Sequence, residues 1–163
     1  MTAAVVPCTA EWPMTPEEIL LIQATFDVLL PISNAVAERF YQHLFDIAPA
    51  VRSRFPDDMR EQYDMLMAMI NAAVHGLWDP DALVPILRQL GQRHVSYGTQ
   101  PADYDLVGEV LLHTLRHYLG IQFTAEVEAA WTTAYTFIAT TMQAGAVEVR
   151  SMAEAPIEPS GRV

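Results

Sequence analysis

The sequence contains no lysine, and its nine basic residues, all arginine, face 20 Asp and Glu residues in a chain of 163. The formal net charge of −11 argues against binding to nucleic acid or to an anionic membrane surface, because the mean field of the protein repels both. Cysteine is nearly absent as well. The single Cys8 allows neither an intrachain disulfide framework nor a cysteine-based zinc site.

Several common motifs are missing too. The chain has no two-residue hairpin signal, no glycine-rich phosphate loop and no Gly-x-Ser-x-Gly nucleophile motif. No uninterrupted apolar run approaches the ~20 residues that span a bilayer. No basic residue precedes Arg39, which argues against a secretory signal. We therefore expect no membrane insertion and a cytoplasmic location.

Helix signals, in contrast, run through the whole chain. Hydrophobic residues make up 52% of it and recur at helical spacing, which predicts the all-α class. Thr15-Pro16-Glu17-Glu18 combines a capping box with a proline at the first helical position. Asp79-Pro80 gives a similar start, Gly98 and Gly120 end helices, and Thr124 caps the last one. The expected helices cover 15–30, 32–46, 57–77, a segment from Asp79 to before Gly98, 104–119 and 124–148.

The ends of the chain differ from its middle. Residues 149–163 are polar and contain two prolines, which favours a disordered tail. Residues 1–14 are expected to form a flexible extension. A single all-α domain is therefore predicted over residues 15–148.

His94 is the most informative candidate for chemistry. It follows Leu90 by four residues and Leu87 by seven, so it shares the helix face that these leucines bury. An imidazole there is either a satisfied core histidine or a ligand for something bound inside. His113 and His117 are spaced i, i+4, but no third ligand aligns with them, which favours a solvated face over a metal site. His43 and His75 appear isolated in the sequence.

Four short motifs, in order, carry a family resemblance. Phe40-Tyr41-Gln42-His43-Leu44-Phe45, followed by Pro49 and Phe55, resembles the second helix and following corner of bacterial single-domain globins and flavohaemoglobins. Arg93-His94-Val95-Ser96-Tyr97-Gly98 and the later Tyr104-Asp105-Leu106-Val107-Gly108 resemble their proximal histidine region. Trp131 and Tyr135 fit the last helix. The similarity covers about residues 15–146.

This resemblance implies a globin fold of about seven to eight helices around haem b. His94 then becomes the proximal iron ligand, with the carbonyl of Leu90 as the natural acceptor for its other ring nitrogen. The resemblance also implies that Tyr104 supports the histidine and that Phe55 packs flat against the porphyrin.

The distal side follows from the same match. Tyr41 and Gln62 are implied as the donors that stabilise a bound gas, and Leu66, one turn after Gln62, covers the iron. The pocket walls implied are Phe45, Val107 and Tyr135. Arg93 is either a partner of a haem propionate or a solvated arginine.

Two departures limit the resemblance. Flavohaemoglobins continue into a reductase, which this sequence lacks, and they carry a glutamate near the proximal histidine. The corresponding position here is Ala146, and Glu148 is expected to face another way. The resemblance therefore implies reversible binding of O2, NO or CO at a pentacoordinate iron, with NO dioxygenation only through an external reductase.

Two other functions stay open. One is a redox or gas sensor or an electron-transfer globin with an endogenous sixth ligand. The other is a globin-shaped interaction module without haem.

Overall fold

The computed structural model describes residues 12–154 of the chain. Within them lie six α-helices and three short 3-10 helices, and no strand. The all-α class is thereby confirmed, with six α-helices where about seven to eight helices were expected. The α-helices are α1 (Pro16–Leu29), α2 (Ser33–Ile47), α3 (Arg60–Gly76), α4 (Pro80–Ser96), α5 (Pro101–Leu119) and α6 (Ala125–Glu154), and the 3-10 helices are η1 (Leu30–Ile32), η2 (Pro49–Arg54) and η3 (Gly120–Gln122).

The predicted helix starts are formed by the expected side chains. Thr15 Oγ1 accepts from the Glu18 N–H, and the Glu18 carboxylate accepts from the Thr15 N–H. Asp79 accepts from the Ala82 N–H at the start of α4, and Thr124 accepts from the Val127 N–H at the start of α6. These bonds satisfy amide groups that a helix leaves unpaired at its first turn.

The core is built where α1 meets α6. Ile22, Phe26 and Leu29 of α1 are at most 1% exposed, and Phe26 packs against Trp131 of α6. The indole N–H of Trp131 donates to Thr25 Oγ1 at 2.9 Å. This bond satisfies two buried polar groups at once, which burial would otherwise penalise.

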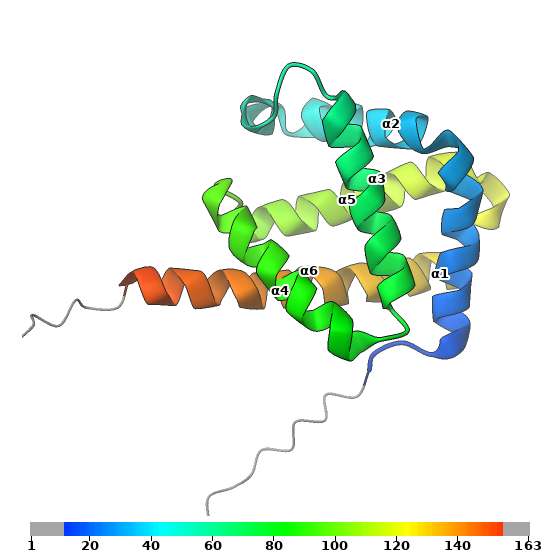
Figure 1. The fold of residues 1–163 in the computed structure, drawn as a ribbon. Helices are drawn as coiled ribbons and strands as arrows, with labels where there is room; N and C mark the ends of the chain where they lie inside the picture. The colour runs from blue at the N-terminus through cyan, green and yellow to red at the C-terminus, as the bar shows by residue number, and fades with distance from the viewer. Residues whose placement is uncertain (1–11, 155–163) are drawn as a thin grey trace, which may run out of the picture.

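Helix α4 packs on α6 through two glycines. A Cβ on Gly91 would lie 1.8 Å from the Met142 carbonyl oxygen, and one on Gly145 would lie 2.1 Å from that of Arg88. Only glycine allows two helix backbones to approach so closely. A short connection joins the end of α3 to the start of α4. From this connection the two helices diverge, so the start of α3 and the end of α4 lie apart (Figure 1).

The first two helices are more apolar than the sequence analysis recognised. The stretch Pro16–Ile47 contains an 18-residue window with a mean hydropathy of 1.7, long and apolar enough to cross a membrane by those two criteria alone, and 33% of that window is buried. Gln23 and Asp27 interrupt it, and Phe26 belongs to the core. The core helix of a protein can meet the same two criteria. Helix α1 is such a helix, because it packs against α6.

Four expected boundaries differ from those of the structure, and one of them is the start of α5, at Pro101 rather than at residue 104. Trp12 packs edge-on against Phe137, and Met14 is buried, so the ordered domain starts before residue 15. Helix α6 continues to Glu154 because Val149 and Arg150 still have neighbours and are half-buried. Helix α3 starts at Arg60 rather than at residue 57. The remaining parts of the expected extension and tail, residues 1–11 and 155–163, lie outside the described residues.

Candidate functional site

Tyr41 and Gln62 meet between α2 and α3. The Gln62 side-chain Nε2 donates to the Tyr41 hydroxyl oxygen at 3.0 Å, and Tyr41 is only 4% exposed. Burial is the largest influence on this hydroxyl and raises its pKa, the Gln62 bond lowers it and Tyr63 raises it further, so the net shift is upward. The two residues implied as distal donors therefore form a bonded pair, and Tyr41 keeps its proton at neutral pH.

Four aromatic rings surround Tyr41. Phe40, Phe45, Phe55 and Tyr63 have ring centroids 5.2, 5.8, 5.4 and 5.8 Å from that of Tyr41. Phe45 and Phe55 also contact each other, at 5.5 Å. Such edge-on and offset contacts hold aromatic side chains in defined orientations. The sequence analysis named Phe45 and Phe55 but missed Tyr63, which follows Gln62 and gave no separate signal.

Arg52 is a second residue that the sequence analysis missed. Its guanidinium donates to the carbonyl oxygens of Phe55 and Pro56 at 3.1 and 3.0 Å and lies 5.1 Å from the Phe45 ring centroid. It therefore fixes the irregular segment that carries Phe55. An open pocket beside Tyr41 is lined by this arginine, by aromatic residues and by polar residues before and at the start of α3: Tyr41, Gln42, Phe45, Arg52, Asp57, Asp58, Met59, Arg60 and Tyr63.

His94 lies in the last turn of α4 and is half-buried. Its Nδ1 is 2.8 Å from the Leu90 carbonyl oxygen, the contact that its position on a helix predicted. Because a carbonyl only accepts, Nδ1 carries a proton, and in the neutral ring the lone pair is then on Nε2. Nε2 makes no hydrogen bond within residues 12–154. Neutral imidazole with an oriented second nitrogen is the form that binds metals.

Tyr104 lies on α5 and Tyr135 on α6. The Tyr135 hydroxyl donates to the Tyr104 carbonyl oxygen, and its ring occupies the space that a Cβ on Gly108 would need, 2.5 Å away. The Tyr104 hydroxyl is buried and has no hydrogen-bond partner among the described residues. The expected contact between Tyr104 and His94 is therefore not among the hydrogen bonds formed.

The other expected site residues lie on three helices. Leu66 and Val107 are half-buried and pack against the cluster that contains Tyr41, whereas Arg93 is exposed. Ala146 is 2% exposed. Glu148 forms an ion pair with Arg88 and accepts a hydrogen bond from Gln92, both on α4. Within residues 12–154, the His94 ring is hydrogen-bonded to the Leu90 carbonyl and to no carboxylate.

The histidines outside the site are not all isolated. His43 of α2 stacks on His113 of α5 with ring centroids 4.0 Å apart, which corrects the expectation for His43. No group of three metal-ligating side chains forms within residues 12–154. His113 and His117 are exposed.

The family model for globins matches residues 38–142, more than half of the chain. The chain belongs to the globin family. A flavohemoprotein of Vibrio cholerae is 33% identical over 129 residues, 77% of this chain but 33% of that protein. One of Rhizobium meliloti is 30% identical over 118 residues, 71% of this chain and 29% of that protein. This globin thus spans about a third of the length of the curated relatives that it matches.

Solved structures give the same fold. An engineered carbene transferase, a putative nitric oxide dioxygenase from Rhodothermus marinus, superposes with a TM-score of 0.77 at 25% identity, covering 87% of this globin and 99% of that chain. A globin of Campylobacter jejuni has a TM-score of 0.74 at 21% identity and covers 84% and 99%.

The residues of this globin fit haem, in agreement with its family. Five apolar side chains on α3, α4 and α5 stay half-buried although they pack against the core: Leu66, Ile70, Leu90, Val107 and Leu111. They lie on the diverging helices and on the helix that crosses behind them (Figure 1). With His94 offering a free Nε2 and a buried Tyr104 hydroxyl left without a partner, this set suits a large apolar group that carries a metal.

Proposed function

We propose that this globin binds haem through His94 and reversibly holds O2, NO or CO beside Tyr41 and Gln62. The observation that carries the proposal is the 3.0 Å hydrogen bond from Gln62 Nε2 to the hydroxyl of the buried Tyr41. Because Gln62 donates to the tyrosine oxygen, the tyrosine proton is left to donate to a ligand. A buried donor of this kind strengthens the binding of a gas that gains negative charge.

Bound haem supplies the iron that takes the gas. The chain supplies the rest. His94 offers Nε2 to the iron, and its Nδ1–H, held by the Leu90 carbonyl at 2.8 Å, keeps the ring in one tautomer and orientation. Phe45, Phe55 and Tyr63 pack around Tyr41 and exclude water from its hydroxyl. A dry site makes each hydrogen bond to the ligand stronger.

NO dioxygenation with an external reductase is a further part of the proposal. Its support is the similarity to flavohemoproteins and to a putative nitric oxide dioxygenase. The turnover needs electrons, which the residues of the candidate site do not provide. A reducing cytoplasm fits this need and the single cysteine.

The alternative, a sensor or electron-transfer globin with a sixth ligand from the chain, has less support. A Tyr41 phenolate is disfavoured, because burial raises the pKa of its hydroxyl. Within the described residues, His75 bonds to Asn71 at the far end of α3 and does not approach Tyr41 or Gln62. No observation favours this alternative.

The test is an absorption spectrum of the purified protein with haem, first ferric, then reduced, then exposed to O2 and to CO. We expect a five-coordinate ferrous spectrum that changes with each gas and reverts when the gas is removed. A six-coordinate ferrous spectrum would support the alternative. Failure to take up haem would overturn both and leave an interaction module.

A further inference from the structure

Residues 97–100 connect α4, which carries His94, to α5, and we call them the corner segment. Its backbone is hydrogen-bonded to that of His94. The N–H groups of Tyr97 and Thr99 both donate to the His94 carbonyl oxygen, at 3.1 and 3.2 Å. Gly98 has a φ of +76°, a left-handed conformation that lets the chain turn back at the helix end. The position of the corner segment is therefore tied to that of His94.

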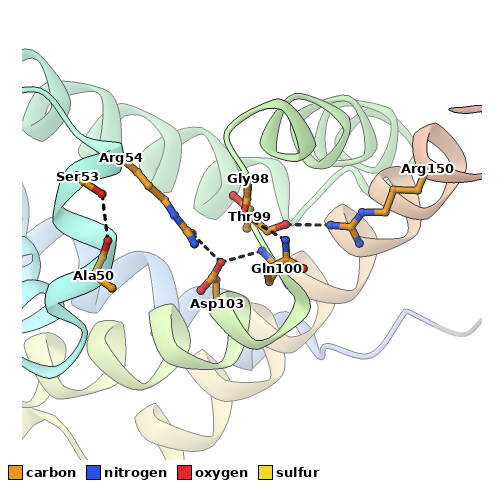
Figure 2. A network of polar contacts seen from close by, with 8 residues as sticks. All are labelled: Ala50, Ser53, Arg54, Gly98, Thr99, Gln100, Asp103 and Arg150. Atoms are coloured by element: carbon orange, nitrogen blue, oxygen red, sulfur yellow. Dashed lines mark hydrogen bonds and ion pairs between the residues drawn. The ribbon is translucent and has the colours of Figure 1, made fainter.

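The peptide unit between Thr99 and Gln100 is bound at both of its polar atoms. Its carbonyl oxygen accepts from Arg150 Nη2 at 2.9 Å, and its N–H donates to Asp103 Oδ2 at 2.7 Å. The same Asp103 oxygen accepts from Arg54 Nη1 at 2.9 Å. Figure 2 shows Arg150 of α6 reaching the Thr99 carbonyl oxygen from one side of the view and Arg54 of η2 reaching Asp103 from the other.

We call the contacts of Arg54, Asp103 and Arg150 the peptide clamp. The clamp lies next to the end of α4, where that helix has no buried residue. The last buried residue of α4 is Gly91, held against Met142. Beyond it, Arg93, Ser96 and Tyr97 are exposed and His94 is only half-buried. A helix end with few buried apolar contacts is held mainly by its hydrogen bonds. Bonds from a charged donor, as in the case of half-buried Arg150, are the stronger ones.

We propose that Arg54 and Arg150 are positioning residues that set the orientation of His94 toward the iron by clamping the Thr99–Gln100 peptide. The inference rests on the proposed function, because it assigns His94 to the iron. Arg54 immediately precedes Phe55, so the clamp also ties the histidine helix to the segment that carries this ring. The position of the ligand and the position of the aromatic wall are thereby set by one network.

The first test uses the haem-loaded protein and the variants Arg150→Met, Arg150→Lys and Arg54→Met. Resonance Raman spectra of the reduced protein report the iron–histidine stretching band. We expect Arg150→Met to shift and broaden this band and Arg54→Met to do so less, because Asp103 still holds the Gln100 N–H. Arg150→Lys should restore most of the band, since an ammonium group can still donate to one carbonyl.

Arg88→Met is the matched control. It also removes an arginine that joins α4 to α6, in this case through Glu148, but it leaves the corner segment untouched. It should leave the iron–histidine band unchanged. If Arg88→Met and Arg150→Met both shift the band, the cause is a general loosening of the contact between α4 and α6. The inference would then be wrong.

A second measurement does not depend on haem. Hydrogen exchange of the Thr99 amide, which donates to the His94 carbonyl, should become about tenfold faster in Arg150→Met, as expected for the loss of one charge-assisted bond. If the wild-type protein lacks an iron–histidine band, the proposed function fails and this inference with it. A normal wild-type band that is the same in Arg150→Met, or unchanged Thr99 exchange, overturns the inference alone.

Discussion

Tyr41 and His94, the central residues of the two sides of the site, are held by different kinds of contact. Tyr41 is 4% exposed and is surrounded by four aromatic rings. His94 is half-buried, and its ring and carbonyl are held by hydrogen bonds to Leu90, Tyr97 and Thr99. Aromatic packing resists changes of pH and salt, whereas a partly exposed ion pair, such as that of Arg54 with Asp103 beside the corner segment, responds to both. We therefore expect the distal side to be the rigid one and the proximal side to be the adjustable one.

Replacement of His94 by Gly gives the largest expected effect. The variant keeps the helix but removes the only imidazole of α4, so the five-coordinate ferrous spectrum should be lost. Added imidazole should restore it, because the space of the side chain is left open. His75→Gly is the control, since His75 is an exposed histidine near the end of α3. An unchanged spectrum in His94→Gly would show that another residue holds the iron.

Gly91→Ala tests the part of the proximal helix that is held by packing. The new Cβ would lie 1.8 Å from the Met142 carbonyl oxygen, so α4 and α6 must separate. Overpacking of this kind costs about 3 kcal/mol, measured as the free energy of unfolding in urea. Gly98→Ala is a useful comparison, because nothing lies within 4 Å of its Cβ and only its positive φ opposes the change. Equal losses in the two variants would contradict the close helix contact.

The sequence was sufficient for the all-α fold, and the family resemblance named Tyr41 and Gln62 without predicting the bond between them. Capping residues such as Thr15 and Asp79 act over three positions, so their bonds follow from local order alone. Tyr41 and Gln62 could be named only through the family resemblance, because 21 residues separate them.

Arg150 shows what the sequence could not give. Its bond to Thr99 joins residues 51 positions apart, and a lone arginine beyond the expected end of the domain carries no pattern. Arg52 was missed for a similar reason. It binds carbonyl oxygens in an irregular segment, where neither spacing nor a capping motif marks such a contact.

Tyr41→Phe tests the hydrogen bond that Tyr41 is proposed to donate to the bound gas. Loss of one hydrogen bond to a ligand that carries partial negative charge should speed O2 dissociation about tenfold to a hundredfold. Gln62→Leu should give a smaller increase, because Tyr41 keeps its own proton but loses the group that orients it. Stopped-flow measurement of O2 release gives both rates. Tyr118→Phe is the control, as its hydroxyl bonds to the Ala35 carbonyl elsewhere. Equal rates in wild type and Tyr41→Phe would remove Tyr41 from the distal role.

Asp103 gives the smallest effect and the one that depends on pH. Burial alone would raise the pKa of this carboxyl, but the bonds from the Gln100 N–H and from Arg54 outweigh burial, so its pKa in the folded protein lies below the ordinary 3.8. A lowered folded pKa means that the ionised carboxylate stabilises the fold fully above the ordinary value, and that this contribution is lost as the pH falls through the lower folded value. Asp103→Asn should therefore cost about 1 kcal/mol or less at pH 7 and progressively less below pH 3.8. Urea unfolding of both proteins between pH 7 and pH 3 gives the difference. If the difference in the free energy of unfolding did not change with pH, packing rather than charge would hold the corner segment, as it holds Tyr41.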